Sequence, residues 1–224
     1  MSLSTGRDAV VGLAVGSIAT PAALAAIAAA ASGGAYDDLR APRIETASDK
    51  GLRGHLRAAR SGRLSGGAVK VAVIGTGALA AAMMVPGPRS PATVLCRGAL
   101  IAGGANLVNL FDLRPGRAGK LALLAGVSGI ASSDPTVAAA SGALTGTLLA
   151  TLPSDLGETG MLGDLGANAL GAVVGLRLAL LPGRFRTVAL GLVAALTLLS
   201  ERVSFSRVIE TVPALRRLDQ LGRT

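Results

Sequence analysis

The sequence predicts an all-α protein, a bundle of membrane-spanning helices. Half of its 224 residues are hydrophobic, only 16% are charged, and 31 are glycine. The mean hydropathy of +0.57 is higher than that of an ordinary soluble domain. Runs without charge recur along the chain, and about 20 apolar residues are enough to cross a bilayer. We therefore expect one membrane domain that covers residues 1–224.

Seven apolar runs are long enough to be predicted as spans. They are residues 9–31, 67–85, 91–109, 119–132, 136–152, 163–181 and 185–200. The first run contains Pro21 and ends in small residues, so a cleaved secretory signal peptide is the alternative for this run alone. The inner segments between the spans are then residues 32–66, 110–118, 153–162 and the tail 201–224.

The distribution of charge predicts the topology. The net charge is +9, and the inner segments hold most of the cations, whereas the outer ones hold only Arg7, Arg89, Arg184 and Arg186. Cytoplasmic loops of membrane proteins carry an excess of Lys and Arg, so we expect the N-terminus outside and the C-terminus in the cytoplasm. With 2% aromatic residues and no Trp, a nucleic-acid stacking surface is not expected.

The tail predicts an amphipathic helix on the inner leaflet. Apolar residues from Val203 to Leu215 alternate with arginines at near-helical spacing, and Pro213 should bend the helix. Its arginines would then contact anionic lipids.

Two glycine patterns occur within the predicted spans. Small residues four apart allow close helix packing in lipid, and the pairs are Gly12 with Gly16, Gly142 with Gly146, and Gly171 with Gly175. Residues 70–80 also resemble the strand and glycine turn of a dinucleotide fold. That motif requires an acid about 20 residues later, where Arg97 stands, so we expect a packing helix instead.

Four polar clusters fall on the predicted inner face. They are Asp37-Asp38, residues 51–57 together with Lys70, Asn106 to Arg117, and Gly163 to Asn168. Adjacent carboxylates repel each other unless a cation or a proton lies between them. Carboxylates suit Mg²⁺, and Arg or Lys suits a diphosphate, which is the combination that phosphoryl transfer needs. One His and one Cys make zinc a poor alternative.

The order of these clusters resembles a known superfamily. Asp37-Asp38, Gly51-Leu-x-Gly54, Asn106-x-x-Asn109-x-x-Asp112 and Gly163-Asp164-x-Gly166 are similar to motifs of the polyprenyl-phosphate N-acetylhexosamine-1-phosphate transferases, relatives of phospho-N-acetylmuramoyl-pentapeptide transferase. The chain is most similar to short bacterial family 4 glycosyltransferases. The resemblance implies a homodimer in a bacterial plasma membrane that transfers a sugar-1-phosphate from a UDP-sugar to polyprenyl phosphate, releases UMP and serves cell-envelope glycan synthesis.

The resemblance also implies residue roles. Asp37 and Asp38 would be catalytic, with Asp37 accepting a proton from the lipid phosphate or orienting it, and Asp164 would bind Mg²⁺ together with Asp38. The implied substrate-binding residues are Arg57, Lys70, Asn106, Asn109, Asp112 and Arg114.

The chain departs from the family pattern in three places. It lacks the first two family spans and the last, it has Leu113-Arg114 where a second acid motif is usual, and residues 200–204 contain no histidine. A non-catalytic relative that binds lipid or scaffolds envelope assembly is therefore the alternative. A transporter or channel is a third hypothesis, based on Arg97 and Arg177 within spans.

Overall fold

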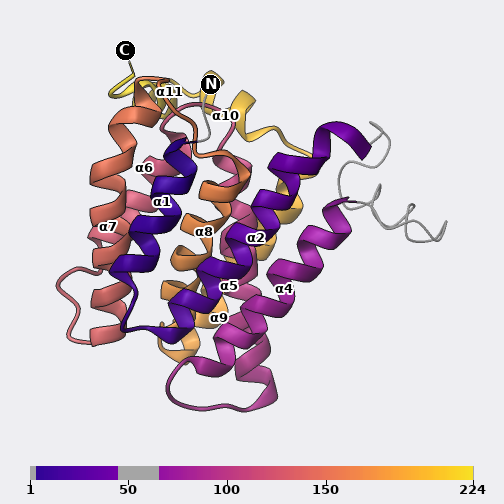
Figure 1. The fold of residues 1–224 in the computed structure, drawn as a ribbon, viewed down its shortest axis with the longest axis vertical. Coiled ribbons are helices and arrows are strands. Elements are labelled where there is room, and N and C mark those ends of the chain that lie inside the picture. Colours follow the sequence, from indigo (N-terminus) through magenta and orange to yellow (C-terminus); the bar gives the residue numbers. More distant parts are fainter. Residues whose placement is uncertain (1–3, 45–65, 224) are drawn as a thin grey trace.

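The computed structural model describes residues 4–44 and 66–223, and within these ranges the chain is helical and has no strand. Figure 1 shows the helices packed side by side in a bundle. The helices are α1 Ser4–Gly16, α2 Pro21–Ile44, α4 Gly66–Met84, α5 Pro91–Phe111, α6 Arg117–Val127, α7 Pro135–Leu156, α8 Gly163–Ala179, α9 Gly183–Ser200, α10 Phe205–Thr211 and α11 Pro213–Gln220. The all-α prediction is confirmed.

The prediction of a single span over residues 9–31 is wrong, because the chain forms two helices there. α1 ends at Gly16 and α2 begins at Pro21. Proline lacks an amide hydrogen and disfavours helical backbone at the preceding residue, so it interrupts a helix and starts a new one. Thr20 closes the turn: its amide donates to the Ser17 carbonyl at 2.7 Å, and its carbonyl accepts from the Leu24 amide.

The second of these helices also extends further than predicted. α2 continues to Ile44, whereas the sequence was expected to leave the membrane and form a loop from residue 32. Gly33 and Gly34 do not end the helix, because they lie against Ile74 of α4 and Asp164 of α8. Tertiary packing thus overrides the low helix propensity of glycine here.

The additional helix places the two termini at the same end of the bundle, whereas the sequence predicted them on opposite faces of the membrane. Both termini lie at the same end of the bundle in Figure 1, and the Gly6 amide donates to the Met161 carbonyl at 3.0 Å, in the loop before α8. The prediction that the termini lie on opposite faces is therefore wrong. Its physical cause is the turn at Pro21, which adds one crossing of the bundle.

α8 is the central helix of the bundle. Its side chains at Leu170, Val173 and Leu176 are fully buried. A Cβ atom added to Gly104 of α5 would lie 2.6 Å from the Gly171 carbonyl oxygen of α8, so the two backbones approach too closely for any side chain. The predicted packing role is thus met at Gly171, and also at Gly12, Gly16 and Gly175, which have close neighbours on other helices.

One predicted glycine pair behaves differently. A Cβ atom added to Gly142 or Gly146 would find no atom of the described chain within 4 Å. This pair instead lines an open groove of about 820 Å³ between α1 and α7. The predicted close packing is therefore not found at this pair within the described residues.

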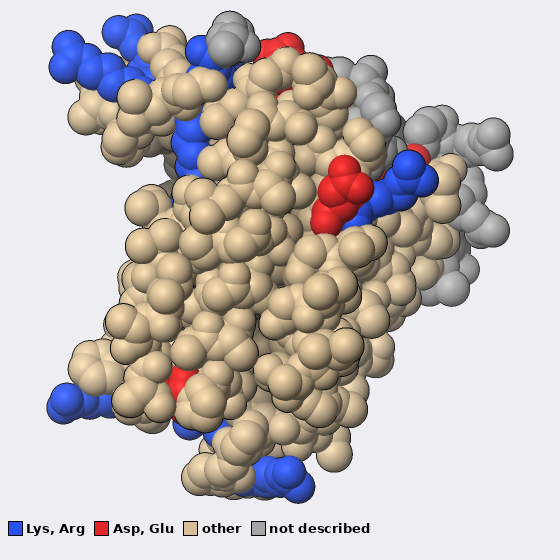
Figure 2. Space-filling model, turned by 60° about the vertical axis from the view of Figure 1, so that its left-hand side comes forward, with Lys and Arg blue, Asp and Glu red and all other residues tan. Residues whose placement is uncertain are grey.

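Four of the described helices are long and apolar enough to cross a membrane, namely α4, α5, α7 and α9. Figure 2 shows Lys and Arg gathered toward the two ends of one face, with a broad uncharged band between them. The 11 residues of α6 reach only about 17 Å, short of the ~30 Å of hydrocarbon. The structure therefore supports a helical membrane protein without confirming seven spans.

The two arginines within predicted spans have structural partners. Arg97 is 4% exposed and donates to the carbonyl oxygens of Val85, Pro86 and Pro88, in the turn between α4 and α5. Arg177 donates to the Ser128 hydroxyl at 3.3 Å, after the end of α6. Arg97 thus binds the backbone of a turn and Arg177 a serine at the end of α6, whereas the Nε atom of each arginine is buried without a partner among the described residues. Residues 70–80 lie within helix α4, as predicted.

A substitution at Gly34 should separate α2 from α8. A Cβ atom at this position would lie 2.6 Å from the Leu165 Cα and still closer to the Asp164 carbonyl oxygen. We expect Gly34→Ala to cost about 1 to 3 kcal/mol, as overpacking does, and to lower the midpoint of thermal unfolding in detergent.

Gly75→Ala is the matched control, because no atom lies within 4 Å of its Cβ position in α4. Alanine favours a helix interior by about 1 kcal/mol over glycine, so this variant should be as stable as the parent or slightly more stable. Equal stability of the two variants would contradict the close contact at Gly34.

Candidate functional site

Two distant acids and one lysine meet at the end of the bundle where both termini lie. The Lys70 ammonium is 2.8 Å from an Asp37 carboxylate oxygen and 2.6 Å from an Asp164 carboxylate oxygen. The three side chains come from α2, α4 and α8. Burial raises the pKa of Asp37, and the ammonium opposes part of that rise. A positive charge thus holds together two carboxylates that would otherwise repel each other.

Asp38, next to Asp37 in the sequence, binds the backbone of α8. Its two carboxylate oxygens accept hydrogen bonds from the backbone amides of Asp164 at 3.2 Å and Leu165 at 3.0 Å. The first amides of a helix have no partner inside the helix, and its N-terminus carries partial positive charge, so a carboxylate is stabilised there. Asp38 therefore fixes the start of α8 beside α2.

Asp112 lies next to this cluster in the loop that follows α5. Burial, with the nearby charges of Asp155, Asp164 and Asp38, raises the pKa of Asp112 from 3.8 to about 7. Asp155, at the end of α7, was not among the predicted site residues. It is 4% exposed and accepts the Gly116 amide at 2.8 Å, which holds the 110–118 loop in place.

The predicted substrate-binding residues divide into three groups. Lys70 and Asp112 lie at the acidic cluster, and Asn109 lies in the last turn of α5 with a buried side-chain oxygen that finds no donor among residues 4–44 and 66–223. Asn106 is exposed, and Arg114 forms an ion pair with Glu210 of α10 instead of reaching the cluster. Arg57 lies outside the described residues.

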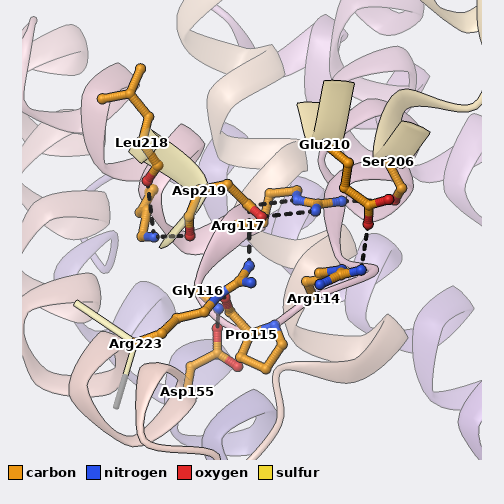
Figure 3. Close-up of polar contacts among 11 residues, drawn as sticks. Arg114, Pro115, Gly116, Arg117, Asp155, Ser206, Glu210, Leu218, Asp219 and Arg223 are labelled. Carbon is orange, nitrogen blue, oxygen red and sulfur yellow. Dashed lines mark hydrogen bonds and ion pairs between the residues drawn. The ribbon is translucent and has the colours of Figure 1, made fainter. Parts of the chain in front are cut away.

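The contact of the C-terminal helices with the 110–118 loop was not predicted. Figure 3 shows Asp219 of α11 between two guanidinium groups. Arg117 binds both oxygens of this carboxylate, at 2.8 and 3.1 Å, and Arg223 binds one of them at 3.1 Å. Phe205 stacks on Phe111 with ring centroids 5.1 Å apart. The predicted amphipathic helix is thus two short helices that meet at Pro213 and dock on the loop.

The acidic cluster can be compared with the needs of a magnesium ion. Within residues 4–44 and 66–223, no set of three His, Cys, Asp or Glu side chains is arranged to hold a metal. Mg²⁺, however, commonly takes only one or two carboxylates and completes its shell with water and substrate phosphates. Asp37 and Asp164 supply two carboxylates at one place, and the Lys70 ammonium occupies the position between them.

Comparisons of the chain with protein families, with curated proteins and with solved structures find no match. The site is therefore characterised by its own geometry.

The raised pKa of Asp112 predicts a pH-dependent effect of Asp112→Asn. Between pH 4 and about pH 7 the folded chain keeps a proton on Asp112 that the unfolded chain releases, so the stability contributed by this group falls as the pH rises through that range. Asparagine does not titrate. The free energy of unfolding of Asp112→Asn, relative to that of the parent, should therefore be higher at pH 8 than at pH 5, by at most about 3 kcal/mol.

Thermal unfolding of both proteins in detergent at the two pH values measures this effect. Titratable groups far from Asp112 contribute equally to variant and parent and cancel in the difference, whereas Asp38, Asp155 and Asp164 interact with Asp112 and add to the measured effect. A stability difference that is the same at pH 5 and pH 8 would show that Asp112 is not buried among these acids.

Proposed function

We propose that this protein is a phosphoglycosyltransferase, which moves a sugar-1-phosphate from a UDP-sugar to polyprenyl phosphate and releases UMP. The observation that carries the proposal is the meeting of Asp37, Lys70 and Asp164 from three separate helices at one end of the bundle. Catalysis of phosphoryl transfer is mostly positioning and charge neutralisation, for which a lysine between carboxylates at a membrane edge is suited.

In this reaction an oxygen of the lipid phosphate attacks the phosphorus that carries the sugar. A new P–O bond forms, and the P–O bond to UMP breaks, with its electron pair leaving on UMP. Asp37 orients the attacking phosphate or accepts its proton, and Lys70 neutralises phosphate charge.

Asp37 and Asp164 are the residues that would hold Mg²⁺ in this proposal. When bound, the ion would neutralise charge on the transferred phosphoryl group. Asp38 contributes by fixing Asp164 at the start of α8, since its own oxygens are engaged with backbone amides.

The charge distribution supports placing this end of the bundle at the cytoplasmic face of a bacterial plasma membrane. The cations of the 110–118 loop and of the C-terminal segment lie here, whereas Arg89, Arg184 and Arg186 belong to the turns that precede α5 and begin α9. Cytoplasmic segments are enriched in Lys and Arg. Because the termini share one end, the N-terminus is then cytoplasmic too. Homodimer formation remains a prediction from the family resemblance.

A non-catalytic relative that binds lipid or scaffolds envelope assembly is the second candidate. Two observations favour it: Lys70 already occupies the position between Asp37 and Asp164, and Arg114 is engaged by Glu210. A protein that only binds lipid would retain such internal ion pairs without turning over a nucleotide sugar.

The purified protein should release UMP when given polyprenyl phosphate, Mg²⁺ and a panel of UDP-sugars. Asp37→Asn and Asp164→Asn should each lower the rate by at least about 100-fold, because each removes a charge that positions the reacting groups. Asp8→Asn, the same change at an exposed acid of α1, is the matched control and should retain activity.

Release of UMP should also stop when EDTA removes divalent ions. If no sugar in the panel yields UMP, or if the two cluster variants turn over as fast as Asp8→Asn, the enzyme proposal is wrong and the lipid-binding alternative stands.

A further inference from the structure

The carboxylate of Asp219 lies in a cationic site that the rest of the chain builds. Arg117 grips both of its oxygens and Arg223 one of them, and both Arg117 and Asp219 are less than 10% exposed. The Lys120 ammonium is 2.7 Å from the Asp219 carbonyl oxygen. Asp155 is near enough to Arg223 to interact with its charge. Three cations therefore surround one carboxylate of the C-terminal helices.

This arrangement has the chemistry of a phosphate site. A guanidinium that donates two parallel hydrogen bonds binds a carboxylate or a phosphate in the same way. Arg117 also donates to the Ser206 hydroxyl at 2.8 Å, so its plane is fixed before any ligand arrives. A phosphate diester carries the same single negative charge as the Asp219 carboxylate and could replace it in this grip.

An apolar groove adjoins the cationic site. Its volume is about 460 Å³, and it runs between α6, α9 and the two C-terminal helices. Arg117, Lys120 and Asp219 form its polar end, and its walls are apolar residues, among them Leu124, Leu199, Phe205, Val208 and Leu218. A ligand that fits both parts has an anionic head and a hydrocarbon tail.

We propose that Arg117, Lys120 and Arg223 form a binding site for the phosphate of an anionic phospholipid, which the C-terminal helices fill with their own Asp219 in the state described here. The lipid phosphate competes with Asp219, and one acyl chain enters the apolar groove. This site lies on α6 and the C-terminal segment, outside the cluster of Asp37, Lys70 and Asp164, and it does not depend on the proposed enzyme activity.

Displacement of Asp219 would also alter the neighbouring loop. Arg223 donates to the Pro115 carbonyl at 2.9 Å, and Arg114 is paired with Glu210, so the docked C-terminal helices hold the 110–118 loop at several points. Lipid binding would displace Asp219 from Arg117 and Arg223 and release the contact of Arg223 with Pro115, while α10 stays docked through Ser206 and Glu210. The membrane composition would then control the position of the loop.

The absence of Trp from the chain allows a direct test with one reporter. Phe205→Trp places a single fluorophore in the groove, in full-length protein reconstituted in phosphatidylcholine nanodiscs. Brominated acyl chains quench nearby Trp, so stronger quenching by brominated phosphatidylglycerol than by brominated phosphatidylcholine reports selective occupation of the groove. We expect this preference in the reporter protein before any further change.

Variants in the reporter background test the competition. Asp219→Asn should lower the phosphatidylglycerol fraction needed for half-maximal quenching about tenfold, which is about 1.4 kcal/mol, because the internal competitor has lost its charge. Adding Lys120→Gln to Asp219→Asn should raise that phosphatidylglycerol fraction again. Adding Arg217→Gln, which removes an equal charge from an exposed position of α11, should leave it unchanged.

Three results would overturn the proposal. Equal quenching by the two brominated lipids would show that the groove has no preference for an anionic head. If Lys120→Gln and Arg217→Gln weaken quenching by brominated phosphatidylglycerol equally, the lipid is attracted by surface charge alone. A shift in reporter emission with inorganic phosphate, but not with phosphatidylglycerol, would assign the cationic site to a soluble phosphate instead of a lipid.

Discussion

The start of α8 is the point on which the rest of the candidate site depends. This helix is buried in the centre of the bundle, and its first amides are bound by Asp38 of α2. Unpaired amides at a helix start are costly to bury, and a carboxylate supplies both the acceptor and the favourable charge. The absence of a side chain at Gly34 allows α2 close enough for this contact. Once α2 and α8 are fixed in this way, Asp37 and Asp164 come within reach of one ammonium, that of Lys70.

The sequence predicted the helices well and their connections less well. Apolar length predicted six of the helices to within a few residues, whereas the apolar run before Ser32 hid the break at Pro21, because composition alone does not distinguish one long helix from two short ones. The order and common face of the polar clusters predicted that Asp37, Asp38, Asp112 and Asp164 converge, and Lys70 was expected separately as a residue that binds a diphosphate. The ion pairs of Arg114 and Arg117 were not predicted. Their partners, Glu210 and Asp219, lie about a hundred residues away, and no local spacing indicates such pairs.

The two polar regions at the end of the bundle where both termini lie differ in the sign of the charge that is in excess. At the acidic cluster two carboxylates contact one lysine, and burial together with the nearby charges of other acids raises the pKa of Asp112 to about 7. At the C-terminal helices three cations share one carboxylate, and the pKa of Asp219 is held below its usual range by the hydrogen bond from Arg117. The 110–118 loop connects the two regions through Gly116 and Asp155.

The energetic coupling between Lys70 and Asp164 tests the central claim most directly. Equilibrium unfolding in mixed detergent micelles would be measured for the parent, for Lys70→Met, for Asp164→Asn and for the double variant. Contact between the two side chains predicts a coupling free energy of at least about 1 kcal/mol, because Lys70→Met removes the cation from Asp164, and Asp164→Asn leaves Lys70 with Asp37 as its one remaining acidic contact among the described residues. Additivity of the two single changes to within about 0.3 kcal/mol would show that the side chains do not meet, and would contradict the account.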